Sequence, residues 1–216
     1  MLRRLRVAWL LSSALAVLSL ALAPQADASQ IAITGLGSGY TPAFSVDSTS
    51  GWSFTAHSNL LVTELGVWDQ GSNGLNHDHD VGLWTAGGVL LGSLNVAAGT
   101  TAPLVSGFRY QTLSSAIALS AGAQYVIGAS YLDVTQGPDP ILQAASFVNT
   151  DPAITWVEAH RFQDLGNLHP GLQFPTALGN DEKSFFGPNF RFTVPEPTVA
   201  ALVAVGLLGI GLRRRR

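Results

Sequence analysis

The chain has 216 residues, of which 11 are Lys or Arg and 14 are Asp or Glu, so its formal net charge at pH 7 is −3. It contains no cysteine, which excludes disulfides, thiolate metal sites and cysteine nucleophiles. Few charges together with many glycines and apolar residues favour short strands and turns over amphipathic helices.

The N-terminus has the parts of a secretory signal peptide. Three arginines within the first six residues precede an apolar run over 7–22, and Ala26 and Ala28 supply the small residues of a cleavage site. We therefore predict a signal helix within 1–28 that signal peptidase removes before Ser29. The alternative is an N-terminal anchor that is never cut.

Between the two ends of the chain lies a body of about 165 residues, long enough for one domain with a single core. This body keeps four basic and twelve acidic side chains, a net charge of −8. An acidic surface repels nucleic acid and anionic lipid, so no nucleic-acid partner is expected.

Apolar and aromatic runs alternate with turn residues along the body. The predicted strands are 52–56, 60–68, 81–85, 89–96, 107–113, 124–131, 154–160 and 189–194. Such spacing, without a sustained helical period, predicts an all-β fold, a single antiparallel β-sandwich of the jelly-roll type. The segment 137–188 is expected to be rich in loops.

Two stretches of the sequence, 80–94 and 60–69, allow sharper predictions. The pair Gly87-Gly88 predicts a tight hairpin between 81–85 and 89–96, because glycine takes positive φ without a steric penalty. Strict alternation over 60–68 predicts one face made of Leu61, Thr63, Leu65 and Val67 and another made of Leu60, Val62, Glu64, Gly66 and Trp68.

The densest cluster of side chains that could bind a metal ion is His77-Asp78-His79-Asp80, which follows Asn76. In an extended chain the two histidines share one face and the two aspartates the other, so imidazoles could hold a transition metal and carboxylates calcium. Either set needs further ligands from elsewhere in the fold, such as His57, Glu158 or His160. The ordinary interpretation is a solvated loop that enters a strand.

Other chemistry is only weakly indicated. Glu158 and His160 would share a strand face and could pair, although an edge histidine is the simpler interpretation. Motifs for serine nucleophiles, phosphate-binding loops and zinc proteases are missing from the sequence. A carboxylate pair for glycoside hydrolysis could come from Asp69, Asp133, Asp164 or Glu158. The body tryptophans, which would either fill the core or stack on sugars, are Trp52, Trp68, Trp84 and Trp156.

The C-terminus combines Val194-Pro195-Glu196-Pro197, an apolar run over 198–212 and the cluster Arg213-Arg214-Arg215-Arg216. The apolar run would be about 22 Å long as a helix, short of the ~30 Å hydrocarbon core of a bilayer. Prolines keep the segment before it extended, and arginines hold the far end in the cytoplasm. We predict a short transmembrane helix with the body outside the inner membrane.

This order of parts resembles the PEP-CTERM sorting signal of Gram-negative bacteria that make extracellular polysaccharide. The resemblance implies that the membrane protease exosortase cuts at the PEP segment, which makes the helix a transient anchor; a plain tail anchor is the alternative. The body resembles an uncharacterised secreted β-sandwich domain common among such proteins, on motifs such as Gly51-Trp52-Ser53-Phe54, Leu65-Gly66-Val67-Trp68-Asp69 and His79-Asp80-Val81-Gly82-Leu83-Trp84. That domain brings no catalytic residues to carry over.

These observations divide the chain into a signal peptide (1–28), a β-sandwich (29–193) and a sorting segment (194–216). The expected protein is non-catalytic, has no cofactor unless the aspartates bind calcium, and is exported to the cell surface or to the extracellular matrix of a biofilm. There it would associate with extracellular polysaccharide. The alternatives are a calcium-stabilised or carbohydrate-binding module, and a metal- or carboxylate-dependent hydrolase.

Overall fold

The computed structural model describes residues 29–37, 41–43, 48–131, 139–163, 171–179 and 182–195. In these ranges the chain forms strands and a short 3₁₀ turn, η1 (Gln70–Ser72), which confirms the predicted all-β class. The strands are β1 (Gln30–Ile31), β2 (Ile33–Leu36), β3 (Thr41–Ala43), β4 (Ser48–Ala56), β5 (Leu60–Trp68), β6 (His79–Thr85), β7 (Leu90–Val96), β8 (Leu104–Val105), β9 (Phe108–Leu119), β10 (Gln124–Tyr131), β11 (Ile141–Gln143), β12 (Val148–Thr150), β13 (Ile154–Gln163), β14 (Thr176–Ala177) and β15 (Pro188–Thr193).

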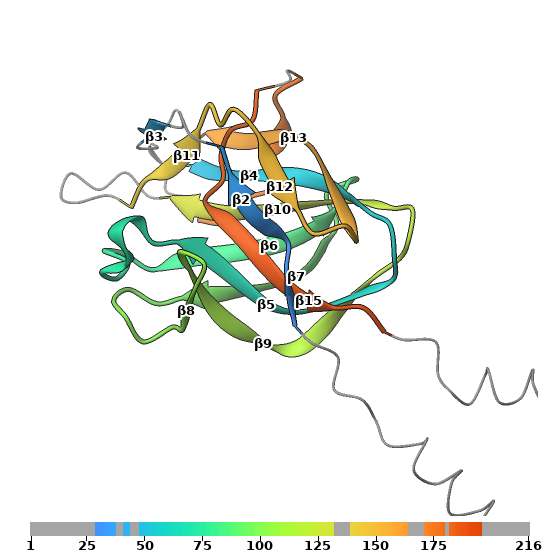
Figure 1. Cartoon of the computed structure of the whole chain (residues 1–216), viewed down its shortest axis with the longest axis horizontal. Coiled ribbons are helices and arrows are strands. Elements are labelled where there is room, and N and C mark those ends of the chain that lie inside the picture. The colour runs from blue at the N-terminus through green and yellow to red at the C-terminus, as the bar shows by residue number, and fades with distance from the viewer. Residues whose placement is uncertain are drawn as a thin grey trace, which may run out of the picture. The chain divides into compact units, whose positions relative to one another are not determined.

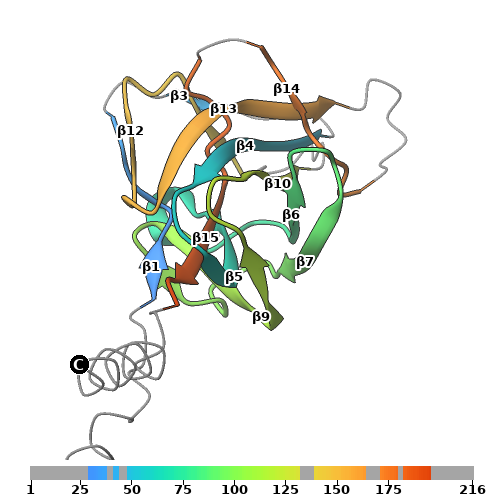
Figure 2. The ribbon, with the colours of Figure 1, turned by 90° about the vertical axis from the view of Figure 1, so that its right-hand side faces the viewer.

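The described strands form two main antiparallel sheets. One has the order β1-β15-β5-β9-β8 and the other β14-β13-β4-β10-β6-β7, and the pairs β3–β11 and β2–β12 stand beside them. Four strands of one sheet, β1-β15-β5-β9, face four strands of the other, β4-β10-β6-β7. Among these eight strands, the chain crosses from one sheet to the other at every connection except β6–β7. This connectivity is that of a jelly roll, to which β13 and β14 are added next to β4. Figures 1 and 2 show the two layers.

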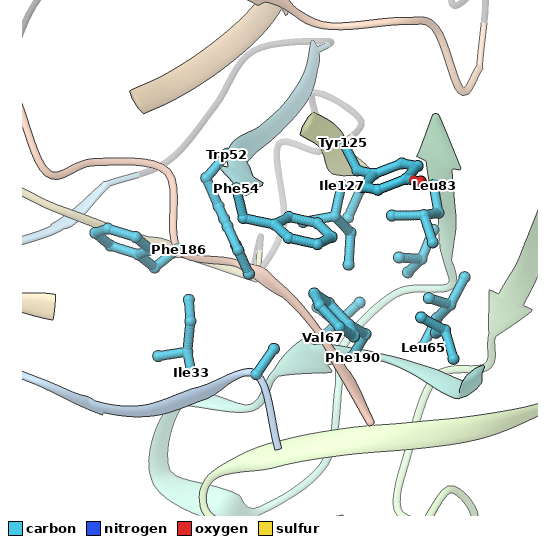
Figure 3. Close-up of a cluster of buried hydrophobic side chains, with 14 of the residues drawn as sticks. Ile33, Trp52, Phe54, Leu65, Val67, Leu83, Tyr125, Ile127, Phe186 and Phe190 are labelled. Atoms are coloured by element: carbon cyan, nitrogen blue, oxygen red, sulfur yellow. The ribbon is translucent and has the colours of Figure 1, made fainter. Parts of the chain in front are cut away.

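Aromatic side chains from both sheets fill the space between the layers (Figure 3). Trp52 and Phe54 on β4 meet Phe190 on β15, with ring centroids 5.9 and 4.9 Å apart, and all three are fully buried. Leu65 on β5 and Ile127 on β10 lie in the same cluster. Burial of such side chains, each worth about 1.5–3 kcal/mol, holds the two sheets together.

The predicted faces of β5 are wrong along half of the strand. Leu60 and Val62 point into the core together with Leu65 and Val67, so the inner face changes parity in the middle. The cause is a bulge at Thr63, where β15 and β9 both shift register against β5. One extra residue in a strand moves all later side chains to the other face.

The predicted Gly87-Gly88 hairpin joins β6 to β7. Thr85 N–H donates to the carbonyl of Val89 at 2.9 Å, and Gly88 adopts φ 86°. Because a residue with a side chain strains this backbone, glycine defines the turn.

Glycines of three neighbouring strands lie side by side on the outer face of the six-stranded sheet. Gly128 on β10 pairs with Gly51 on β4 and with Gly82 on β6. The indole of Trp84 fills the space beside Gly82, where an added Cβ would lie 2.5 Å from a ring carbon. Phe174 packs edge-on against that indole, 6.1 Å away. Trp84 is therefore only 4% exposed on an outer face, which removes it as a platform for sugars.

The two ends of the compact unit Ser29–Val194 lie next to each other, because β1 pairs with β15. The amide of Asn189 extends this pairing. Its Oδ1 accepts from Ile33 N–H at 3.0 Å and its Nδ2 donates to the Ile33 carbonyl at 3.1 Å. The predicted signal helix and the predicted transmembrane helix lie outside the described residues. Among the residues that the structure describes, no helix has the length and apolar character needed to span a bilayer.

Candidate functional site

The most connected group of polar side chains surrounds His79 at the start of β6. This histidine is 3% exposed. Its Nδ1 lies 2.7 Å from the carbonyl oxygen of Ser130, and its Nε2 lies 3.0 Å from Oδ2 of Asp139. Asp139 also accepts from the backbone N–H groups of Asn76 and His77, at 3.0 and 2.9 Å. The group ties the loop before β6 to β10 and to the segment that begins at Asp139.

The contacts of His79 hold its ring and the Asp139 carboxylate in place. Nδ1 faces a carbonyl oxygen and therefore donates, and Nε2 faces the carboxylate. Burial by itself would raise the pKa of Asp139. The hydrogen bonds from His79 and from the two backbone amides, with the electrostatic effect of His79, outweigh burial and hold that pKa below its usual value. The Asp139 carboxylate is therefore ionised at neutral pH and is held by His79 and by two backbone amides.

Tyr131 lies against the imidazole, with ring centroids 4.8 Å apart. Its hydroxyl has no hydrogen-bond partner among the residues described, and it occupies the space that a Cβ on Gly187 would need. Burial, followed by the charge of Asp139, raises the pKa of Tyr131 well above its usual value. The phenol stays protonated and acts as a packing group.

The other members of the predicted metal cluster point elsewhere. Asp78 accepts from the N–H of Ala98 at 2.7 Å, and Asp80 accepts from the amide of Asn95 at 2.9 Å. Both aspartates are exposed, whereas His79 is buried. In the part of the chain that the structure describes, no three His, Asp or Glu side chains gather as they would around an ion. The structure thus joins His79 to Asp139 and leaves Asp78 and Asp80 at the surface.

The residues considered as additional ligands have partners of their own. His57 Nε2 lies 2.7 Å from the Thr155 hydroxyl. His160 Nδ1 donates to the carbonyl of Pro175 at 3.0 Å, and its Nε2 is 3.8 Å from Glu158, too long for a hydrogen bond. Burial lowers the pKa of His160, although the Pro175 carbonyl and Glu158 oppose this. Glu158 and His160 do lie close together, as predicted for one strand face, but no hydrogen bond joins them.

Of the carboxylates considered for glycoside hydrolysis, Asp69 is held by an arginine. Its Oδ2 lies 2.8 Å from Nε of Arg109, and the two side chains are 1% and 6% exposed. Asp133 and Asp164 lie outside the described residues. Asp69 is therefore a structural anion that fixes the start of η1 to β9.

Among the tryptophans, Trp68 has the setting of a binding surface. It is half-buried and lines a pocket of about 170 Å³ together with Phe108. Hydroxyl-bearing Thr34 and Ser106 lie at the same pocket, and Gly35 leaves one wall without a side chain. Flat apolar rings beside hydroxyl groups can hold a sugar by stacking and hydrogen bonding.

Sequence reasoning missed the partners in both places. Asp139 stands between two prolines and has the pattern of an ordinary turn, and Ser130 contacts His79 through its backbone carbonyl, which no side-chain pattern reveals. Phe108 was visible as part of a predicted strand. Its position beside Trp68 depends on the β5–β9 register.

Two known sequence families match the chain. The family described as Domain of unknown function (DUF4082) matches residues 42–185. The family described as PEP-CTERM protein-sorting motif matches residues 193–216. No curated protein sequence matches.

Proposed function

The chain belongs to the DUF4082 family and ends in a PEP-CTERM protein-sorting motif, and from this premise we propose a non-catalytic protein of the cell surface or extracellular matrix. The motif marks an exported protein that exosortase processes for the cell surface. One observation carries the proposal: the motif begins at residue 193, where β15 ends. The sorting signal is thus attached to the folded body without a linker.

The proposal gives each end of the chain a role. Residues 1–28 direct export and are removed by signal peptidase between Ala28 and Ser29. Val194-Pro195-Glu196-Pro197 is the segment that exosortase reads, and Arg213 to Arg216 hold the tail in the cytoplasm until it is cut. Residues 29–193 are the part that is delivered.

The proposed absence of catalysis is supported by how the described ionisable groups are used. His79 engages both ring nitrogens in the interior, and Asp69 is paired with Arg109. A general base must lie within reach of a substrate. Both pairs are buried, and none of their side chains is more than 6% exposed.

Association with extracellular polysaccharide is the finer part of the proposal. Its support is the pocket beside Trp68, with two aromatic rings and two hydroxyl side chains. The body has a net charge of −8, so an uncharged or basic polysaccharide fits better than a strongly acidic one. Sugars of that kind are recognised by stacking more than by charge.

Trp68→Ala is expected to weaken retention of the protein on matrix polysaccharide from its own organism about tenfold, because the stacking surface is lost. Affinity electrophoresis with that polysaccharide measures the effect. Trp156→Ala is the matched control, because Trp156 on β13 is also half-buried but does not line this pocket, and it should leave retention unchanged. Equal retention of both variants would show that the polysaccharide does not bind at Trp68. If the unaltered protein is not retained either, the protein does not bind this polysaccharide.

Intact mass and C-terminal peptide mapping of protein recovered from outside its native cells test the sorting step. The expected product begins at Ser29 and lacks everything after the Pro195-Glu196-Pro197 region. A Glu196→Ala variant is expected to keep the tail. Recovery of unaltered protein that still carries Arg213 to Arg216 would show a permanent anchor and contradict the processing.

A further inference from the structure

Both termini of the body emerge from one end of the sandwich. In the β1–β15 pair, Gln30 is opposite Phe192 and Ile31 is opposite Arg191. Ala32 N–H continues the contact to the carbonyl of Phe190 at 3.0 Å. Because the strands are antiparallel, the first residue of one lies beside the last residues of the other. The leader and the sorting motif are therefore joined to the body at the same place.

We call this end the terminal pole, made of residues 29–31, 56–61, 86–91, 117–125 and 192–194. Backbone contacts connect its parts: Thr193 pairs with Leu61, Gly122 N–H donates to the Ala56 carbonyl at 2.7 Å, and Ala86 N–H donates to the Gln124 carbonyl at 3.2 Å. In Figure 2 the β6–β7 hairpin and the ends of β9 and β15 lie on the side that faces the viewer.

The terminal pole is uncharged on an otherwise acidic body. None of its residues is Asp, Glu, Lys or Arg, although the body has a net charge of −8. Between Asp80 and Asp133 the sequence has a single charged residue, Arg109, which is buried against Asp69. The turn beside the pole, whose Ala153 carbonyl accepts the His57 N–H at 2.7 Å, adds one half-buried carboxylate, Asp151. Asp151 accepts the N–H of Ala153 at 2.8 Å, and His57 contacts Thr155. A surface of this kind can approach anionic headgroups that repel the rest of the body.

The hairpin at this pole has an apolar tip. Val89, Leu90 and Leu91 are consecutive and are 64%, 49% and 37% exposed. The other large apolar side chains that are exposed in the described ranges, such as Leu104 and Phe147, occur singly. Single exposed apolar residues are ordinary, but a contiguous group marks a contact surface.

We propose that the terminal pole is a membrane-docking surface, whose tip Val89–Leu91 enters the headgroup region of the bilayer while the tail is still attached. This proposal rests on the proposed function, because it assumes that the C-terminal tail enters a membrane. Three observations favour a lipid surface over a second copy or a polysaccharide: both termini leave from this pole, the one carboxylate beside its segments is the half-buried Asp151, and its tip is aliphatic. Aliphatic side chains without aromatic rings suit an acyl boundary better than a sugar.

The test uses the full chain in vesicles of phosphatidylethanolamine and phosphatidylglycerol. Because the chain has no cysteine, Leu90→Cys introduces a single site for an environment-sensitive dye. Leu104→Cys is the matched control. Leu104 is 40% exposed against 49% for Leu90, and it lies on β8 beside the start of β9, at the opposite end of the sandwich.

The expected result is blue-shifted emission at position 90 and quenching by brominated lipid that is several-fold stronger than at position 104. Equal quenching at both positions, or at neither, would overturn the proposal. Self-quenching between two dye-labelled chains that increases with protein concentration would show that the pole binds a second copy of the chain and not the membrane. C-terminal mapping of native protein is independent of these outcomes, so failure of the docking surface and failure of the sorting function are told apart.

Discussion

Arg109→Met is expected to lower the free energy of unfolding of the body by about 3–5 kcal/mol, because it leaves the Asp69 carboxylate buried without its cation. Arg109 also donates from Nη1 to the carbonyls of Thr100 and Ala102, at 3.1 and 2.9 Å. Among the described groups, Asp69 Oδ2 would keep the Gly74 N–H at 3.0 Å. Denaturant unfolding of the altered and unaltered proteins measures the difference.

Arg191→Met is the matched control. Arg191 lies 2.7 Å from Glu64, but the two side chains are 24% and 22% exposed, so water screens their interaction. The expected loss is about 1 kcal/mol or less. The double variant Asp69→Asn with Arg109→Met should recover part of the loss, because no unpaired charge stays buried. Equal losses of unfolding free energy for the two arginine variants would show that burial of the Asp69–Arg109 pair does not make it more stabilising than the exposed Arg191–Glu64 pair.

Asp139→Ala is expected to destabilise the body by about 1–3 kcal/mol. It removes the acceptor of the Asn76 and His77 amides and the carboxylate that faces Nε2 of His79. Asp139→Asn should cost less, since an amide can donate to Nε2 of a neutral imidazole. Thermal or denaturant unfolding at neutral pH measures both variants.

The same pair predicts a pH dependence. The pKa of Asp139 is lower in the folded protein than in the unfolded chain, so its contribution to stability is present above the usual aspartate pKa of about 3.9. That contribution is lost as the pH falls below this value towards the folded pKa. Asp139→Ala should therefore flatten the acid limb of the stability curve.

Asp80→Ala, one position after His79, is the control for both measurements. Asp80 is exposed and accepts from Asn95. Its removal is expected to change stability by about 0.5 kcal/mol at most. An acid limb that is equally steep with and without Asp139 would contradict the lowered pKa of Asp139.

How far the sequence predicts the site is clearest at His79. The sequence pointed to 77–80 as the densest polar cluster, and His79 is indeed the most connected polar side chain there. Its partner Asp139 is 60 positions away, and its other acceptor is the backbone carbonyl of Ser130. The pleat of the strand places His79 on the other face from Asp78 and Asp80, as the sequence predicts. Among the described residues, no further ligand joins either set.

The tryptophans show the same limit. All four occur in apolar strand patterns, and the pattern alone does not separate core from surface. Trp84 is on an outer face, yet it is buried because Gly82 makes room for it and Phe174 covers it. The bulge at Thr63 likewise reverses the alternation of β5, since register depends on the strands on either side.

By itself the sequence determined the all-β class, the Gly87-Gly88 hairpin and the PEP-CTERM motif. Each of these depends on residues that are close in sequence: alternation over a few residues, a turn that needs glycine, and a linear signal read as an extended chain. Tertiary structure alone decided the β5 bulge and the Asp69–Arg109 and His79–Asp139 pairs. It also decided the hydrogen bonds from the Asn189 side chain to the backbone of Ile33, which lie beside the β1–β15 pair at the two termini. These contacts join residues 40 to 156 positions apart, and only the packing of two sheets around one core brings such residues together.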